Sequence, residues 1–237
     1  GEPVRLLDQA DQLALLERDL PALGLDHYLR LHEPLLELQH ILGAISRAKD
    51  EVFSPADYAA AAARMQTVAR NEEDQLRADK AAEVARVYAH YERRMRTDGV
   101  VDFADLINRP IEILRTHPDV REELRAQYRH LLVDEYQDVN RASALLLKEL
   151  AGHGERLWVV GDARQSIYRF RGAAPINTRD FEKDYPNGKR KPLAVNYRSQ
   201  KQIVDTFGAY AKGMQVGRGR SSVLEAKRGD GVEAVDY

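Results

Sequence analysis

The sequence of 237 residues contains no cysteine, which excludes disulfide bonds, thiolate zinc sites, iron–sulfur clusters and cysteine nucleophiles. It also lacks any run of about 18 apolar residues, so we expect no transmembrane helix. The first residues carry no apolar core of a signal peptide. Hydrophobic residues make up 43% and charged residues 31% of the chain, a composition typical of globular proteins rather than disordered ones. These absences favour a cytoplasmic protein with no membrane partner.

The net charge of −2 conceals an uneven distribution along the chain. Lys and Arg number 13 against 17 Asp and Glu in residues 1–97, 8 against 13 in residues 98–163, and 15 against 8 in residues 164–237. A basic segment in an otherwise acidic chain suggests an anionic partner. A solvated surface without a partner explains the same counts, so charge alone leaves the function open.

Residues 1–98 are predicted to be helical almost throughout, with no strand. Leucine-rich stripes of helical spacing lie within residues 6–20 and again after Pro34. The segment Ser54-Pro55-Ala56-Asp57 is typical of a helix start, and the sequence that follows favours two helices joined near Asn71. We interpret this part as a helical accessory domain. Its histidines lack metal-ligand spacing and are interpreted as ordinary helix-surface residues: His27, His32 and His40.

From residue 99 onward, short apolar segments alternate with helical ones. Strands of this kind pair in parallel and are buried on both faces of the sheet. The predicted fold class is therefore α/β, with a parallel sheet that follows a mostly helical subdomain. A loop is predicted for residues 213–231 and one more strand for residues 232–237. The predicted strands are 131–133, 157–160 and 193–195. One helix is predicted to open at residues 102–107, and others to span residues 118–128, 142–150 and 199–212.

Polar residues follow each predicted strand, at the edge where parallel sheets bind ligands. Asp134 and Glu135 follow the first strand, Asp162 and Gln165 the second, and residues 196–198 the third. A carboxylate in such a place can hold Mg²⁺ on the phosphates of a nucleotide, and a neighbouring one can deprotonate the attacking water. Taken alone, two acids after an apolar strand more often only cap the next helix.

Three longer segments favour the nucleotide site over the helix cap. Residues 132–140 (LVDEYQDVN) resemble motif II of the UvrD/Rep/PcrA helicases of superfamily 1. Residues 160–173 (VGDARQSIYRFRGA) resemble motif III, and residues 196–199 (NYRS) resemble motif IV. The three segments stand in the order of the family, and the resemblance is clear from about residue 101 to about residue 212.

The resemblance implies part of a RecA-like P-loop NTPase fold with a helical insertion. Residues 1–98 correspond by position to the inserted subdomain 1B. Residues 99–190 correspond to the C-terminal part of the first RecA-like domain (1A), and residues 191–237 to the start of the second (2A).

The resemblance also implies a role for each polar residue in the hydrolysis of ATP. Asp134 is expected to bind Mg²⁺, and Glu135 to act as the catalytic base. Gln165 is expected to contact the γ-phosphate and the attacking water, and Tyr197 to stack on the adenine. Arg198 is expected to serve as the arginine finger, because a planar guanidinium suits the charge that develops on the transferring phosphoryl group.

Motif III further implies a contact with DNA. Phe170 matches an aromatic residue, most often Trp, that stacks on a base, and such stacking tolerates any base. Arg169 and Arg171 beside it suit the phosphates of DNA, and Tyr168 suits either a DNA contact or the core. The implied partners are single-stranded and duplex DNA, ATP, and repair or replication proteins.

The sequence lacks the phosphate-binding loop G-x-x-x-x-G-K-[ST] that the family requires. The one Gly-Lys pair, Gly188-Lys189, has no matching first glycine, and motifs V and VI are missing. We therefore expect an internal fragment of an ATP-dependent 3′–5′ DNA helicase or translocase, inactive as this chain alone. The alternatives are a non-catalytic module for nucleic-acid or protein binding derived from a helicase, and the helicase part of a helicase–nuclease.

Overall fold

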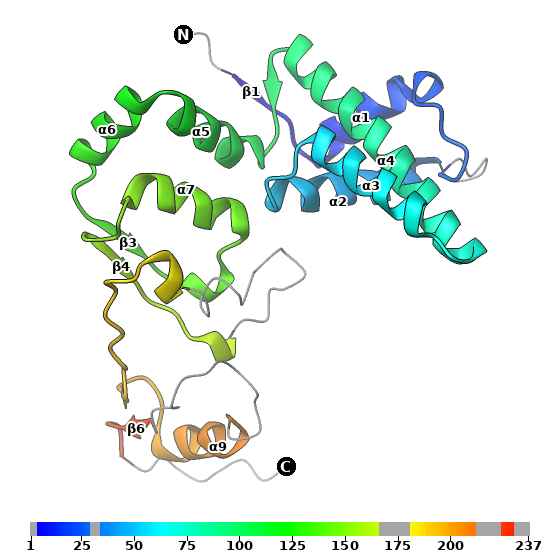
Figure 1. Ribbon diagram of the computed structural model, residues 1–237. Helices are drawn as coiled ribbons and strands as arrows, with labels where there is room; N and C mark the ends of the chain where they lie inside the picture. The colour runs from blue at the N-terminus through cyan, green and yellow to red at the C-terminus, as the bar shows by residue number, and fades with distance from the viewer. Residues whose placement is uncertain (1–3, 29–33, 166–180, 212–223, 230–237) are drawn as a thin grey trace. The chain divides into compact units, whose positions relative to one another are not determined.

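The computed structural model describes residues 4–28, 34–165, 181–211 and 224–229 (Figure 1). The chain divides into two compact units, of which the first comprises residues 1–128 and 140–150 and the second residues 129–139 and 151–237. The predicted subdomain boundaries after residues 98 and 190 differ from this division and stay predictions. In the described part of the chain, no helix combines the length and apolarity needed to span a bilayer.

The first unit is mostly helical. Ser54 and Asp57 form a reciprocal capping box at the start of one helix, and the Asn71 side chain accepts the N–H of Asp74 at the start of the next. The predicted helix start and the predicted joint near Asn71 are both confirmed. The elements before residue 99 are α1 (Gln9–Arg18), the 3-10 helix η1 (Leu20–Ala22), α2 (Pro34–Asp50), α3 (Pro55–Val68) and α4 (Glu72–Thr97).

The prediction of no strand in residues 1–98 is wrong. Arg5–Leu6 forms strand β1, which pairs in parallel with β2 (Val100–Val101). Two residues are too few for an alternating pattern, and the leucines around β1 have the spacing of a helical stripe. Gly99, at φ +64°, follows the end of α4 and leads the chain into β2. The pairing therefore joins the two ends of the helical segment.

Lys49 lies at the centre of a buried ion cluster beside the apolar core of α1, α2 and α4. Its ammonium is 2.8 Å from a carboxylate oxygen of Glu92 and 2.7 Å from one of Asp102 and one of Asp105. The Lys49 side chain is 3% exposed, and the Tyr91 hydroxyl donates to Asp102 at 3.0 Å. Burial lowers the pKa of Lys49, but the surrounding carboxylates outweigh it and raise the pKa above its ordinary value.

A second buried carboxylate corrects the interpretation of His27 as a helix-surface residue. Glu83 on α4 accepts the backbone N–H groups of Asp26, His27 and Tyr28 and lies 2.7 Å from Nδ1 of His27. Burial raises the pKa of Glu83, but these hydrogen bonds lower it below its ordinary value. His27 therefore belongs to a turn that a buried carboxylate holds in place. His40 is exposed on α2 as predicted, and His32 lies outside the described residues.

Three further helices complete the first unit: α5 (Asp105–Thr116), α6 (Pro118–Gln127) and α7 (Arg141–Ala151). Glu149 on α7 connects them, because its carboxylate pairs with Arg115 of α5 at 2.8 Å and its carbonyl accepts from Arg125 of α6 at 2.6 Å. The predicted helices that begin at Pro118 and near residue 142 are confirmed.

The second unit contains the predicted parallel pair. Strand β3 (Leu131–Val133) pairs with β4 (Leu157–Val159), with Leu132 opposite Trp158. The prediction that both faces are buried is wrong for the described residues, since Leu132 is 78% and Trp158 64% exposed. Successive side chains of a strand point to opposite faces of the sheet. The first and third residues of each strand therefore share the other face, and their side chains are half-buried.

The strand predicted at residues 193–195 begins two residues later and ends one residue later than expected. Strand β5 is Val195–Asn196 and pairs in parallel with β6 (Glu225–Ala226). Helix α9 (Lys201–Ala211) lies between these two strands in the sequence. Strand β6 falls in residues 213–231, for which a loop is predicted, because a two-residue strand among Gly, Arg and Ser leaves no pattern. The predicted strand at 232–237 lies outside the described residues.

We expect the substitution Lys49→Met to lower the free energy of unfolding by about 3–5 kcal/mol, because three carboxylates would stay buried without their counter-charge. Urea denaturation of this chain measures the effect. Arg77→Met is the control, since Arg77 pairs with Glu73 at an exposed site on α4 and should change stability by less than about 1 kcal/mol. Equal losses in the two variants would contradict a supporting role for the cluster.

Candidate functional site

The structure brings the first two predicted polar segments together at one edge of the β3–β4 pair. Backbone hydrogen bonds continue past the ends of both strands. The N–H of Val160 donates to the carbonyl of Val133 at 2.8 Å, and the N–H of Tyr136 donates to the carbonyl of Val160 at 2.9 Å. The segment with Asp134 and Glu135 therefore runs beside the segment that leads to Asp162.

Glu135 occupies an uncommon backbone conformation at the turn out of β3. Its φ of +50° and ψ of +43° lie in the left-handed region, which few residues other than glycine adopt. The Asp134 carboxylate accepts the N–H of Glu135 at 2.9 Å, and the 3-10 helix η2 (Tyr136–Asp138) follows at once. The carboxylates of Asp134 and Glu135 are both exposed, so a ligand in solution can reach them.

Gln137 joins the two segments; it lies within the segment that resembles motif II, but the sequence predicts no role for it. Its side chain is 2% exposed. The amide nitrogen donates to Oε2 of Glu135 at 2.5 Å and contacts Oδ2 of Asp138 at 3.5 Å. The amide oxygen accepts the backbone N–H of Asp162 at 2.9 Å. One buried amide thus links the carboxylate of Glu135, after β3, to the backbone after β4.

Gly161 provides the space that this amide requires. A Cβ atom at position 161 would lie 2.7 Å from Oε1 of Gln137 and 3.2 Å from the backbone nitrogens of Tyr136 and Gln137. A side chain there would push against the turn that holds Glu135, so the close approach of the two segments requires glycine.

Asp162 extends the network to Gln165. Its carboxylate accepts the backbone N–H of Arg164 at 3.0 Å and the side-chain amide of Gln165 at 3.2 Å. The N–H of Gln165 donates to the Asp162 carbonyl at 2.8 Å and closes the 3-10 helix η3 (Ala163–Gln165). Glu135 and Gln165 are therefore connected through Gln137 and Asp162 at the strand ends.

An aromatic cluster packs against the turn after β3. Tyr136 is buried, and its ring meets Phe181 edge-on with 5.6 Å between centroids. Burial, reinforced by the charge of Asp184, raises the pKa of Tyr136 to about 12, so its hydroxyl stays neutral at physiological pH. Phe181 in turn contacts Tyr185, whose ring centroid lies 5.0 Å away.

Comparison with known proteins gives the family. The UvrD/REP helicase N-terminal domain matches this chain over residues 2–186. The chain belongs to this family. The match includes residues 2–100, where the sequence resemblance rested on position alone, and it ends before the segment that resembles motif IV.

Individual relatives agree with the family. The ATP-dependent DNA helicase UvrD1 of Mycobacterium leprae is 40% identical over 209 residues, and the ATP-dependent DNA helicase PcrA of Bacillus subtilis 39% over 199 residues. PcrA of Staphylococcus aureus is 36% identical over 207 residues. The alignments cover 84%, 84% and 87% of this chain. The chain spans about a quarter of the length of these relatives (25%, 24% and 26%).

The remaining residues predicted for the UvrD/REP site lie on other segments. Asn196 follows directly on Val195 in β5, and its side chain accepts the N–H groups of Arg198 and Ser199 at 2.9 and 2.8 Å. This turn presents Tyr197 and Arg198 with exposed side chains, and their roles stay predictions. The predicted DNA contacts lie outside the described residues: Tyr168, Phe170, Arg169 and Arg171.

The strand ends fit Mg²⁺ by the chemistry of their donors. Mg²⁺ in nucleotide sites uses one or two carboxylates and takes its other ligands from phosphates and water. Asp134 and Glu135 supply exposed carboxylate oxygens of this kind. The described residues contain no group of three or more His, Cys, Asp or Glu side chains that could hold a metal ion.

We expect Gln137→Leu to lower the free energy of unfolding by about 1–3 kcal/mol, because the substitution leaves the N–H of Asp162 without its acceptor. Chemical denaturation of this chain measures the change. Gln75→Leu is the control, because Gln75 is exposed on α4 and should alter stability by no more than about 0.5 kcal/mol. If the two variants were equally stable, the amide would not be what holds the strand ends together.

Proposed function

We propose that this chain forms the part of an ATP-dependent DNA helicase that supplies the carboxylates of the nucleotide site. The fold proposed for this part is that of a RecA-like P-loop NTPase, with residues 1–98 as the inserted subdomain. The observation that carries the proposal is the network at the ends of β3 and β4, which links Glu135 to Gln165 through Gln137 and Asp162. The relatives named ATP-dependent DNA helicases support the same conclusion.

In this proposal the two carboxylates after β3 have different tasks. Asp134 holds Mg²⁺, which neutralises charge on the β- and γ-phosphates of ATP when it is bound. Glu135 accepts the proton of the attacking water. Because Gln137 already donates to Oε2 of Glu135, Oε1 is the oxygen left to receive that proton. Gln165, at the end of the same network, contacts the γ-phosphate and orients the water.

Further residues complete the proposed site. Tyr197 stacks on the adenine, and Arg198 stabilises the charge on the transferring phosphoryl group. Phe170, with its neighbouring tyrosine and arginines, contacts DNA. In the whole protein, hydrolysis drives movement in the 3′–5′ direction along single-stranded DNA and the unwinding of duplex DNA. A cytoplasmic location and partners among repair or replication proteins belong to the same proposal.

A non-catalytic binding module is the second candidate, and a helicase–nuclease is a variant of the first. A module that only binds has no chemical use for Glu135 held in a left-handed conformation by a buried amide. Unusual backbone conformations of this kind cluster at active sites. We therefore favour the enzyme.

In a helicase of the relatives' full length, Glu135→Gln should slow ATP hydrolysis by roughly 10²–10⁴-fold, because the amide keeps the shape of the side chain and cannot accept a proton. ATP binding, measured by fluorescence titration, should stay nearly unchanged. The matched control is Glu73→Gln on the surface of α4, which should hydrolyse ATP at the wild-type rate. A Glu135→Gln enzyme with wild-type turnover would contradict the assignment of the base.

A further inference from the structure

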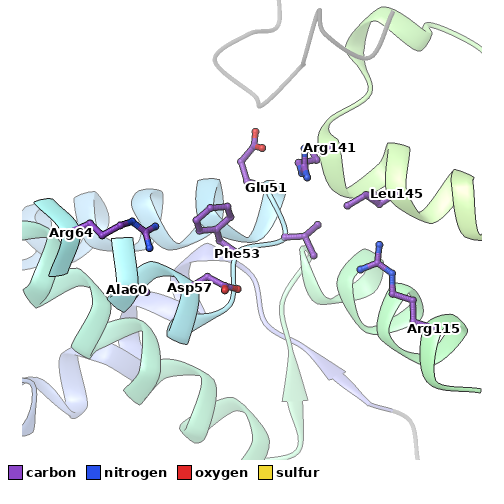
Figure 2. A pocket seen from close by; sticks show the side chains of 9 residues that line it. Glu51, Phe53, Asp57, Ala60, Arg64, Arg115, Arg141 and Leu145 are labelled. Atoms are coloured by element: carbon purple, nitrogen blue, oxygen red, sulfur yellow. The ribbon is translucent and has the colours of Figure 1, made fainter. Parts of the chain in front are cut away.

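A cavity of about 370 Å³ lies within the first unit. Its wall combines three arginines with apolar side chains and with the carboxylates of Glu51 and Asp57. Its volume lies at the low end of the range for small-ligand sites. Figure 2 shows the side chains around it. The lining residues that matter here are Val52, Phe53, Arg64, Arg115, Arg141 and Leu145.

Specific contacts hold the walls of the cavity together. The side-chain amide of Asn140, at the start of α7, donates to the carboxylate of Asp50, the last residue of α2, at 2.8 Å. Arg115 on α5 pairs with Glu149 on α7 at 2.8 Å. These contacts therefore tie α7 to the end of α2 and to α5, which carry residues of the cavity wall or lie next to them.

The cavity also contains a strained residue. Val52 lies at φ +57°, where a β-branched residue is an outlier and where glycine usually ends a helix. Its N–H donates to the carbonyl of Lys49 at 2.9 Å, and the N–H of Phe53 donates to the carbonyl of Ala48 at 2.8 Å. The resulting turn leaves the Phe53 ring at the edge of the cavity, 42% exposed.

Three arginines from three helices border the same space. Arg64 comes from α3, Arg115 from α5, and Arg141 from the first turn of α7, where the helix dipole adds positive potential (Figure 2). Glu149 neutralises Arg115, and Asp57 is occupied by its capping box with Ser54. Within the described residues, no hydrogen bond or ion pair engages the guanidinium of Arg64 or Arg141.

We propose that this cavity binds one segment of a single DNA strand, with backbone phosphates on Arg64 and on Arg141 and a base against Phe53. The inference rests on the proposed function in DNA unwinding and adds a contact outside motif III. Guanidinium groups suit phosphate oxygens. An exposed aromatic ring beside cations is the combination that binds single strands without sequence preference. An acidic peptide would use the same cations but would have no need of the ring.

The test is the affinity of this chain for a fluorescein-labelled oligothymidine of twelve nucleotides, measured by anisotropy at several salt concentrations without ATP. Arg64→Ala combined with Arg141→Ala should weaken binding about tenfold or more. The slope of log affinity against log salt should fall by about 0.7 for each phosphate that the variant no longer neutralises. Phe53→Ala should weaken binding with the slope unchanged. Melting temperatures check that each variant is folded.

The matched control removes two surface arginines of α4, Arg77 and Arg93, and should change affinity less than twofold. An equal loss in both double variants would overturn the proposal in favour of unspecific attraction. Competition by polyglutamate as effective as that by unlabelled oligothymidine would overturn it in favour of an acidic peptide. Failure of the unaltered chain to bind oligothymidine would overturn it as well. These outcomes are independent of the ATP hydrolysis that tests Glu135.

Discussion

The arrangement at the strand ends depends on one buried amide. Gln137 donates to Glu135 and accepts the N–H of Asp162, so the turns after β3 and β4 cannot move independently. Buried amides are costly unless their hydrogen bonds are made, and here both ends of the side chain have partners. At Gly161 the two segments lie so close together that a side chain at this position would collide with the amide of Gln137. Through this amide, a shift in the position of Gln165 can alter the position of Glu135, the proposed catalytic base.

The helical unit depends on a different constraint. Lys49 meets three carboxylates inside the protein, and the parallel pairing of β1 with β2 closes the helical segment at its ends. A buried charge with several partners favours one packing over its alternatives, since any rearrangement would leave a charge unpaired. The same unit contains the arginine-lined cavity, whose walls are tied by Asp50 and Glu149. The proposed DNA contact therefore lies in a unit whose helices these contacts tie together.

Sequence reasoning predicted the helices and the parallel pair well, because caps such as Ser54 and apolar runs such as residues 131–133 are local signals. It missed β1 and β6, which are two residues long and owe their existence to distant partners. The positions of Asp134, Glu135 and Gln165 at one edge followed from the parallel pairing. The role of Gln137 did not, because it arises from a hydrogen bond to a residue 25 positions away. His27 was misjudged for the same reason.

The central claim is that the ends of β3 and β4 form the ATP hydrolysis site of the whole protein. A crystal structure of the full-length helicase with Mg²⁺, ADP and aluminium fluoride tests it most directly. The account predicts Mg²⁺ within direct or one-water reach of Asp134, and the attacking water hydrogen-bonded to Oε1 of Glu135 with Gln137 still on Oε2. A nucleotide bound elsewhere, with Asp134 and Glu135 facing only solvent, would contradict it.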